Sequence, residues 1–205
     1  MNDGRDQPVV RLSLESVKCF LATHWKVYLL FFLIAGLVVF LDQWTKGIVR
    51  LHVPLGADWM PWDWLAPLAR VRHWYNTGAA FGLFQGHAWV FMLLAVLVSS
   101  LLVYYIPQTT PQDWPMRLAM ALWLGGAIGN LIDRIRFDGR VTDFISVGTF
   151  PVFNIADSSI SIGVAVMILW VWLQERANKR IKMQQLAINS DQDSQADIKG
   201  SSESG

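Results

Sequence analysis

Aspartates supply most of the candidate chemistry in this chain of 205 residues. Asp143 lies in the segment V-T-D-F, and Asp157 lies in the segment F-N-I-A-D-S. Two carboxylates that lie close together in a low-dielectric site share one proton. One of them then acts as a general base on a water molecule, while the protonated partner polarises a carbonyl and later serves the leaving amine. If both side chains reach one site, this pair predicts peptide hydrolysis.

Both carboxylates also have a purely structural interpretation. Asp157 lies near the start of an expected helix, where the helix dipole favours a negative charge but where aspartate is also a common N-terminal cap. The structural interpretation of Asp143 is that it is an exposed carboxylate in a loop. The apolar Phe144 and Ile145 that follow it favour burial at a membrane edge instead.

Three further polar residues belong to the same set of motifs. Asp133 precedes Arg134, which indicates a structural ion pair or a cap. Asn130 and Asn154 each offer both donors and acceptors, so that they are suited to hold loop backbone or a substrate amide.

Other hydrolytic chemistries have little support in the sequence. No Gly-x-Ser-x-Gly segment occurs, and Ser158, Ser159 and Ser161 have the spacing of small packing residues on a helix. The single cysteine, Cys19, excludes a disulfide framework and a Cys-rich zinc site. The histidines lack metal-ligand spacing; they are His24, His52, His73 and His87.

The elements that must position these residues are membrane helices. The chain is 53% hydrophobic and only 16% charged, whereas soluble domains have about 25% charged residues. A net charge of +1 argues against a nucleic-acid partner. Four apolar segments predict transmembrane helices: 27–41, 88–106, 118–132 and 155–173.

Two of these segments are short. Only 15 uncharged residues separate Lys26 from Asp42, and 15 separate Arg117 from Asp133. Because a span takes about 20 residues, Asp42 and Asp133 must lie at or inside the membrane boundary. A carboxylate at that depth is costly and indicates a functional site, with a cap in the headgroup layer as the alternative.

An even number of spans places both termini on one side of the membrane. That side has nine Lys or Arg residues near the membrane and the other has seven, and the dense cluster 176–182 favours cytoplasmic termini. The polar motifs then meet on the opposite side, where we expect one polar site. Its members are Asp42, Thr45, Lys46, Asn76, Gly78, Asn130, Asp133, Arg134, Asp143, Asn154 and Asp157.

Two other function classes remain open on the residues alone. A proton-coupled transporter with an acidic site uses carboxylates at membrane depth, although the second span and the cytoplasmic halves of the others are almost wholly apolar. A membrane scaffold whose aspartates only cap helices is the third possibility.

Taken together, the segments resemble bacterial lipoprotein signal peptidases, also called signal peptidase II. The resemblance covers residues 25–172 and rests on five ordered motifs: L-D-Q-W-T-K, Y-N-T-G-A-A-F-G, G-G-A-I-G-N-L-I-D-R, V-T-D-F and F-N-I-A-D-S. It implies an aspartic endopeptidase of the bacterial inner membrane. Such an enzyme removes the signal peptide from diacylglyceryl-modified prolipoproteins by cleaving before the lipidated cysteine.

The resemblance also implies roles for individual residues. It makes Asp143 and Asp157 the catalytic pair. It assigns substrate binding or site support to Asp42, Lys46, Asn76, Gly78, Asn130, Asp133, Arg134 and Asn154. It implies a four-transmembrane-helix bundle, all-α apart from a small extracytoplasmic β-cradle, with no metal or organic cofactor. Its partners are prolipoproteins and membrane lipids, and we expect a monomer with its active site facing the periplasm.

The domain limits follow from composition and from this resemblance. We expect a cytoplasmic N-terminal extension over 1–24, the membrane peptidase domain over 25–174 and a polar cytoplasmic tail over 175–205 that becomes disordered at its end. Residues 51–75 look suited to an interfacial amphipathic platform, with Trp59, Trp62, Trp64 and Trp74 as anchors. Gly78 and Gly82 indicate a tight turn or close backbone approach.

One feature departs from the family pattern. Only 13 residues lie between Asp143 and Asp157, which is a shorter connection than is expected for many members. The shape of the loop that covers the site is therefore the least predictable part of the domain.

Overall fold

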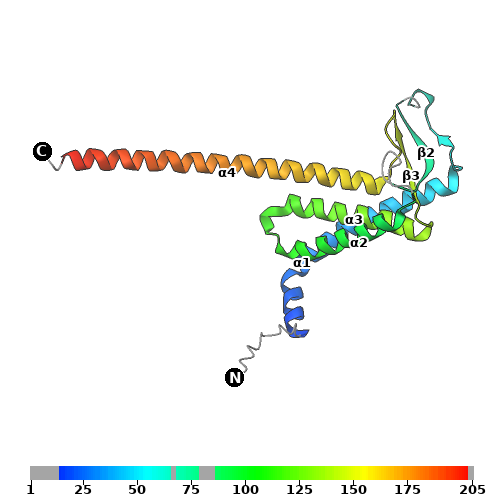
Figure 1. Cartoon of the computed structure of the whole chain (residues 1–205), viewed down its shortest axis with the longest axis horizontal. Helices are drawn as coiled ribbons and strands as arrows, with labels where there is room; N and C mark the ends of the chain where they lie inside the picture. The colour runs from blue at the N-terminus through cyan, green and yellow to red at the C-terminus, as the bar shows by residue number, and fades with distance from the viewer. Residues whose placement is uncertain (1–13, 66–67, 79–85, 203–205) are drawn as a thin grey trace, which may run out of the picture.

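The computed structural model describes residues 14–65, 68–78 and 86–202 as four long helices and a small sheet (Figure 1). The long helices are α1 (Leu14–His52), α2 (Ala88–Tyr105), α3 (Trp114–Arg136) and α4 (Ile155–Ser202). The strands are β1 (Asp58–Trp59), β2 (Ala69–Asn76) and β3 (Val141–Val147). Short 3-10 helices occupy Asp63–Leu65 (η1), Ile106–Gln108 (η3) and Pro111–Asp113 (η4).

Four segments are long and apolar enough to cross a membrane, as the sequence predicts: His24–His52, Ala88–Gln108, Pro111–Arg136 and Ile155–Leu186. The first of them continues ten residues past Asp42, so Asp42 lies inside α1 and does not end it. The predicted span 27–41 was therefore too short, because it stopped at the first charge. Beyond that charge, one face of α1 with Lys46 and Val49 is still buried in the protein.

Helix α3 is the centre of the bundle and contacts each of the other three long helices. In its most apolar stretch 50% of the residues are buried, against 6% for α2. Its glycines make this close packing possible. A Cβ added at Gly125 would lie 2.6 Å from the Cβ of Val38 on α1, and one at Gly126 would lie 2.5 Å from the carbonyl oxygen of Ala156 on α4. Small residues let helix backbones approach in this way.

The strands form one antiparallel sheet in the order β1-β2-β3 at the end of the bundle where α1 ends and α4 begins (Figure 1). Asn76 of β2 pairs with Val141 of β3, and the register is irregular between Val71 and Trp74. This sheet confirms the predicted β-cradle. Gly82 lies outside the described residues.

The predicted platform 51–75 consists of the end of α1, β1, η1 and most of β2. Its indole rings are exposed: 54% for Trp59, 58% for Trp62, 73% for Trp64 and 52% for Trp74. Val49 of α1 and Val53, which directly follows the helix, pack with Phe144 of β3, so the apolar core continues under the sheet. The sheet is thus fastened to the bundle and presents its tryptophans outward.

The extent of α4 differs from the sequence-based expectation, whereas the link before it is as short as the sequence indicates. Helix α4 continues to Ser202, beyond the point where we expected helical order to decay. Residues 175–199 contain no glycine or proline, and many of them are good helix formers. The short link from β3 to α4 turns at Gly148, which has φ of +50°, and returns so that Phe153 bridges Ile145. The short connection noted in the sequence is thus a sharp turn.

Gly126→Ala should destabilise the bundle, because the added methyl group meets the Ala156 carbonyl, which cannot move without α4. We expect a loss of about 1–3 kcal/mol, seen as a lower melting temperature of the purified protein. Gly36→Ala is the matched control, since nothing lies within 4 Å of its added Cβ and alanine favours the helix. Equal melting temperatures for the two variants would contradict this packing.

Candidate active site

Asp143 lies in the middle of β3 and is 1% exposed. Its Oδ1 accepts a hydrogen bond from Asn154 Nδ2 at 2.7 Å, and its Oδ2 accepts one from Asn76 Nδ2 at 3.1 Å. Asn76 reaches Asp143 along a diagonal of the sheet, because its direct partner in the register is Val141. The predicted burial of Asp143 is confirmed, and the exposed-loop alternative is wrong.

Asp157 lies in the first turn of α4 and forms a reciprocal cap with Asn154. The Asp157 backbone N–H donates to Asn154 Oδ1 at 2.9 Å, and the Asn154 backbone N–H donates to Asp157 Oδ2 at 3.3 Å. The other carboxylate oxygen, Oδ1, accepts from Asn130 Nδ2 at 2.7 Å. Asp157 is therefore the N3 partner of Asn154 in a capping box, which confirms its structural interpretation as part of the helix cap, and its side chain also projects toward Asp143.

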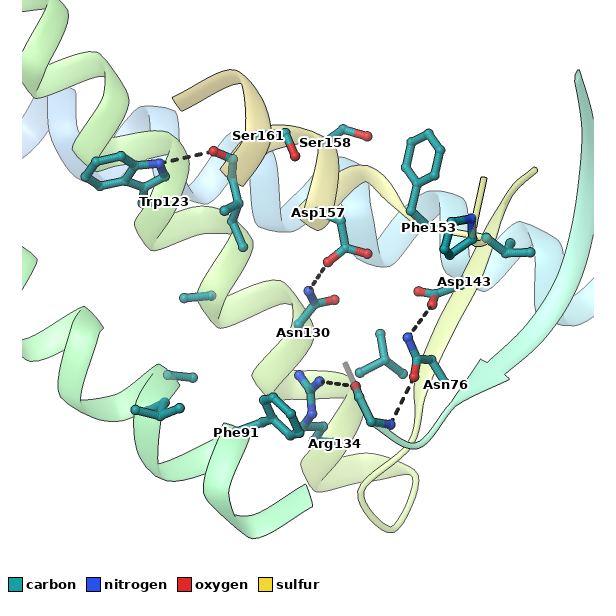
Figure 2. Close-up of a pocket in the computed structure, with 18 of the residues that line it drawn as sticks. Asn76, Phe91, Trp123, Asn130, Arg134, Asp143, Phe153, Asp157, Ser158 and Ser161 are labelled. Carbon is teal, nitrogen blue, oxygen red and sulfur yellow. Dashed lines mark hydrogen bonds between the residues drawn. The ribbon is translucent and has the colours of Figure 1, made fainter. Parts of the chain in front are cut away.

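Both carboxylates line one pocket of about 880 Å³, and Figure 2 shows them facing each other across it. Asn76, Gly78, Asn130 and Arg134 line the same pocket. Asp42, Lys46, Asp133 and Asn154 lie behind it and are fully buried. The structure thus brings together ten of the eleven residues that we expected at this site. The exception is Thr45, whose hydroxyl donates to the Leu41 and Asp42 carbonyls within α1.

Behind the pocket lies a buried ion cluster. Lys46 Nζ lies 2.8 Å from Asp42 Oδ2 and 3.3 Å from Asp133 Oδ2. It also donates to Asn130 Oδ1 at 3.1 Å. A buried ammonium needs such compensation on every side, because desolvation of an unpaired charge costs several kcal/mol. Asp133 pairs with Lys46 and not with its neighbour Arg134, so the predicted ion pair exists with a different partner.

The two carboxylates of this cluster hold the backbone next to the pocket aspartates. Asp133 Oδ2 accepts from the N–H of Thr142, the residue before Asp143, at 2.9 Å. Asp42 Oδ1 accepts from the N–H of Ala156, the residue before Asp157, at 2.9 Å. One buried lysine therefore joins the anchors of both elements.

Residues 34–173 match the family model described as "Signal peptidase (SPase) II". The chain belongs to the signal peptidase II family. The match includes both pocket aspartates and the ion cluster. Membership makes the protein an aspartic peptidase and decides against the transporter and scaffold alternatives.

Individual relatives agree with this assignment. The chain is 37% identical to a "Lipoprotein signal peptidase" of Anoxybacillus flavithermus, over 76% of this chain and 92% of the relative. It is 38% identical to another of Halalkalibacterium halodurans, over 75% and 99%. The solved structure of a bacterial membrane enzyme is also similar to this chain, with a TM-score of 0.65 and 34% identity. The match covers 72% of this chain and 89% of that one.

In this signal peptidase II chain, Arg134 holds the turn at the edge of the pocket. Its guanidinium lies over the Phe91 ring of α2, 5.1 Å from the centroid, and donates to the Gly78 carbonyl at 3.5 Å (Figure 2). The Gly78 N–H donates to Asn76 Oδ1 at 2.9 Å, which fixes the amide that contacts Asp143. The predicted tight turn at Gly78 is confirmed.

Two supporting residues of the peptidase were missed by sequence reasoning. Gln43 donates to Asp133 Oδ1 and to the Gly129 carbonyl, both at 3.0 Å. Arg50 donates to Thr142 Oγ1 at 2.9 Å. Helical spacing offered a signal for Arg50, because it follows Lys46 by four residues and shares its face of α1. Gln43 stands within the L-D-Q-W-T-K motif but has no such periodic relation.

The electrostatics of the pocket favour one protonated carboxyl group. Burial and the nearby charge of Asp157 raise the pKa of Asp143 to about 7, although hydrogen bonds from Asn76 and Asn154 oppose this rise. Near neutral pH Asp143 therefore holds a proton for a substantial fraction of the time. Within the described residues, no group of three or more His, Cys, Asp or Glu side chains is arranged to hold a metal ion.

Lys46→Met should destabilise the peptidase strongly, because it leaves Asp42 and Asp133 buried without their shared cation. We expect a loss of about 3–5 kcal/mol, measured as a lower melting temperature in detergent. Lys179→Met is the matched control: Lys179 pairs with Glu175 at the same four-residue spacing, but on an exposed surface. A similar melting temperature for both variants would contradict a buried ion cluster.

Proposed function

We propose that Asp143 and Asp157 are the catalytic pair of an endopeptidase that removes signal peptides from diacylglyceryl-modified prolipoproteins, before the lipidated cysteine. The observation that carries this proposal is the pair of carboxylates facing one pocket with different surroundings. Asp157 receives hydrogen bonds at a helix N-terminus, which favours its charged form. Asp143 is the better holder of the shared proton.

The reaction follows from these two protonation states. Asp157 takes a proton from a water molecule as the water oxygen attacks the scissile carbonyl carbon. The proton of Asp143 moves to the carbonyl oxygen and gives a tetrahedral intermediate. When this collapses, the C–N bond breaks and the proton taken up by Asp157 passes to the leaving amine, which becomes the new N-terminus at cysteine. Asp143 takes back a proton from one hydroxyl of the intermediate as the carboxylic acid product forms. In this scheme the general base, and not the partner that is protonated at the start, serves the leaving amine.

The walls of the pocket support a lipid-modified substrate. α2 lines one side and α4 the other, with Trp123 and Ala127 of α3 between them. All lining side chains from α2 are apolar: Phe91, Leu94, Ala95 and Val98. Helix α4 adds the apolar Ile160, Ile162 and Val164, and its polar lining residues are Asp157, Ser158 and Ser161. Acyl chains between these helices would hold the modified cysteine next to the two carboxylates. Contact between an acyl chain and these apolar side chains does not require the desolvation of a polar group.

The membrane arrangement is part of the proposal. The described start of α1 and the end of α4 lie away from the sheet, which agrees with cytoplasmic termini (Figure 1). The site and sheet then face the extracytoplasmic side of a bacterial cytoplasmic membrane, with the four exposed tryptophans at the interface. The enzyme acts as a monomer without a cofactor, with prolipoproteins and membrane lipids as its partners.

Asp143→Asn and Asp157→Asn should each reduce cleavage to below about 1% of the wild-type rate, because either change removes one proton-transfer group. The measurement is product mass after incubation of the purified, folded protein with a synthetic diacylglyceryl-modified precursor. Asp138→Asn is the control, because this carboxylate is 94% exposed and lies outside the pocket.

Retained activity in either pocket variant would refute the catalytic assignment. The unlipidated precursor, assayed in parallel, tests the substrate class separately. Equal cleavage of both precursors would be consistent with Asp143 and Asp157 as the catalytic pair, but it would contradict a requirement for the lipid.

The pH dependence tests the shared proton. As pH rises through about 7, Asp143 loses its proton, both carboxylates become ionised, and kcat/KM should fall. Asn76→Ala removes a donor that favours ionised Asp143, so the falling limb should move to higher pH. Asn178→Ala, on an exposed turn of α4, should leave the limb in place. A limb that moves to lower pH in Asn76→Ala would contradict this role.

A further inference from the structure

A second groove lies between the first halves of α1 and α3, at the end of the bundle away from the sheet. Its volume is about 370 Å³. The described residues that line it are Lys26, Val27, Leu30, Phe31, Ile34, Trp114, Arg117 and Leu118. Two of them are cations, and none of the residues named for this lining is acidic. None of them lines the pocket that contains Asp143 and Asp157.

The two cations lie at the same level of the fold. Lys26 and Arg117 each directly precede a run of 15 uncharged residues, on helices that both lead toward the sheet. They therefore mark the membrane boundary at this end. Trp25 and Trp114 beside them are 53% and 64% exposed, as expected for rings at that boundary.

Neither cation is neutralised by a carboxylate among the described ion pairs. Arg117 uses Nε and one terminal nitrogen, Nη2, to hold Thr109, both at 2.7 Å, so its other terminal nitrogen stays available. Lys26 Nζ lies 5.7 Å from the centroid of the Trp25 ring. The nearby Asp113 carboxylate accepts bonds from the backbone and hydroxyl of Thr110 and interacts electrostatically with Arg117, but the two form none of the described ion pairs.

The rest of the groove is hydrocarbon. Leu30 and Ile34 follow Lys26 at helical spacing on α1, and Leu118 follows Arg117 on α3. Phe31 is 2% exposed and closes the floor. The groove thus has a cationic mouth at the membrane boundary and an apolar slot that leads into the hydrocarbon layer.

We propose that this groove binds one anionic phospholipid, with its phosphate between Lys26 and Arg117 and an acyl chain along Leu30 and Ile34. A zwitterionic lipid fits less well, because its own cation would approach two positive charges. Basic pockets between transmembrane helices bind lipid headgroups on this principle. With the orientation proposed above, the lipid belongs to the cytoplasmic leaflet.

Native mass spectrometry of the full chain in detergent, titrated with phosphatidylglycerol or with phosphatidylcholine of the same acyl chains, tests the site. We expect one saturable site that prefers phosphatidylglycerol by about tenfold. Lys26→Gln combined with Arg117→Gln should abolish the preference. Lys26→Gln alone should weaken it severalfold while leaving the Arg117 contacts to Thr109 intact. Ile34→Trp should reduce binding by filling the slot with both charges in place.

The control removes two cations elsewhere, as Arg180→Gln with Lys182→Gln on exposed turns of α4. Equal affinity for the two lipids would overturn the proposal. So would an equal loss of preference in the control, or unchanged binding in Ile34→Trp, since either indicates diffuse surface attraction. No precursor is present in the experiment, so its result is independent of the proposed peptidase function.

Discussion

The site depends on the burial of Lys46 between Asp42 and Asp133. Each carboxylate uses one oxygen near this lysine, and each accepts a backbone N–H directly before a pocket aspartate. The strand β3 and the helix α4, which follow each other in the chain, are thereby anchored through Asp133 of α3 and Asp42 of α1 to the same lysine. Because a buried charge without its partner is costly, the cluster permits little relative movement of β3 and α4. Burial of these charges costs free energy, and its structural effect is to fix the positions of β3 and α4.

A layer of amides lies between this cluster and the pocket. Asn154 contacts both aspartates, while Asn130 joins Lys46 to Asp157. Amides donate without adding charge, so they can orient both carboxylates and still leave one proton to be shared. Further charges at these positions would fix a single ionisation state. The close approach that this layer requires depends on α3, where Gly129 lies so near Asp42 that an added Cβ would be 2.8 Å from its Oδ2.

Several features could be predicted because they are local. The apolar runs, the order of the motifs and the asymmetric placement of Asp42, Asp133, Asp143 and Asp157 indicate the spans and one polar end. Other features could not, because they depend on partners far along the chain. The adjacent pair Asp133 and Arg134 suggested a mutual contact, yet successive residues on a helix point in different directions, and each has a partner elsewhere. The contacts of Gln43 could not be predicted either, because its partners Gly129 and Asp133 lie far along the chain.

The sequence by itself determined that the chain spans a membrane and gathers its carboxylates at one end, because hydropathy and charge position depend only on residue order. It also carried the five motifs of the signal peptidase II family. Only the tertiary structure decided which oxygen accepts which hydrogen, how sharply Gly148 turns the chain back over β3, and where two cations meet beside an apolar slot. These depend on helix contacts across many residues, and a linear pattern specifies the faces of helices but not the neighbours that those faces meet.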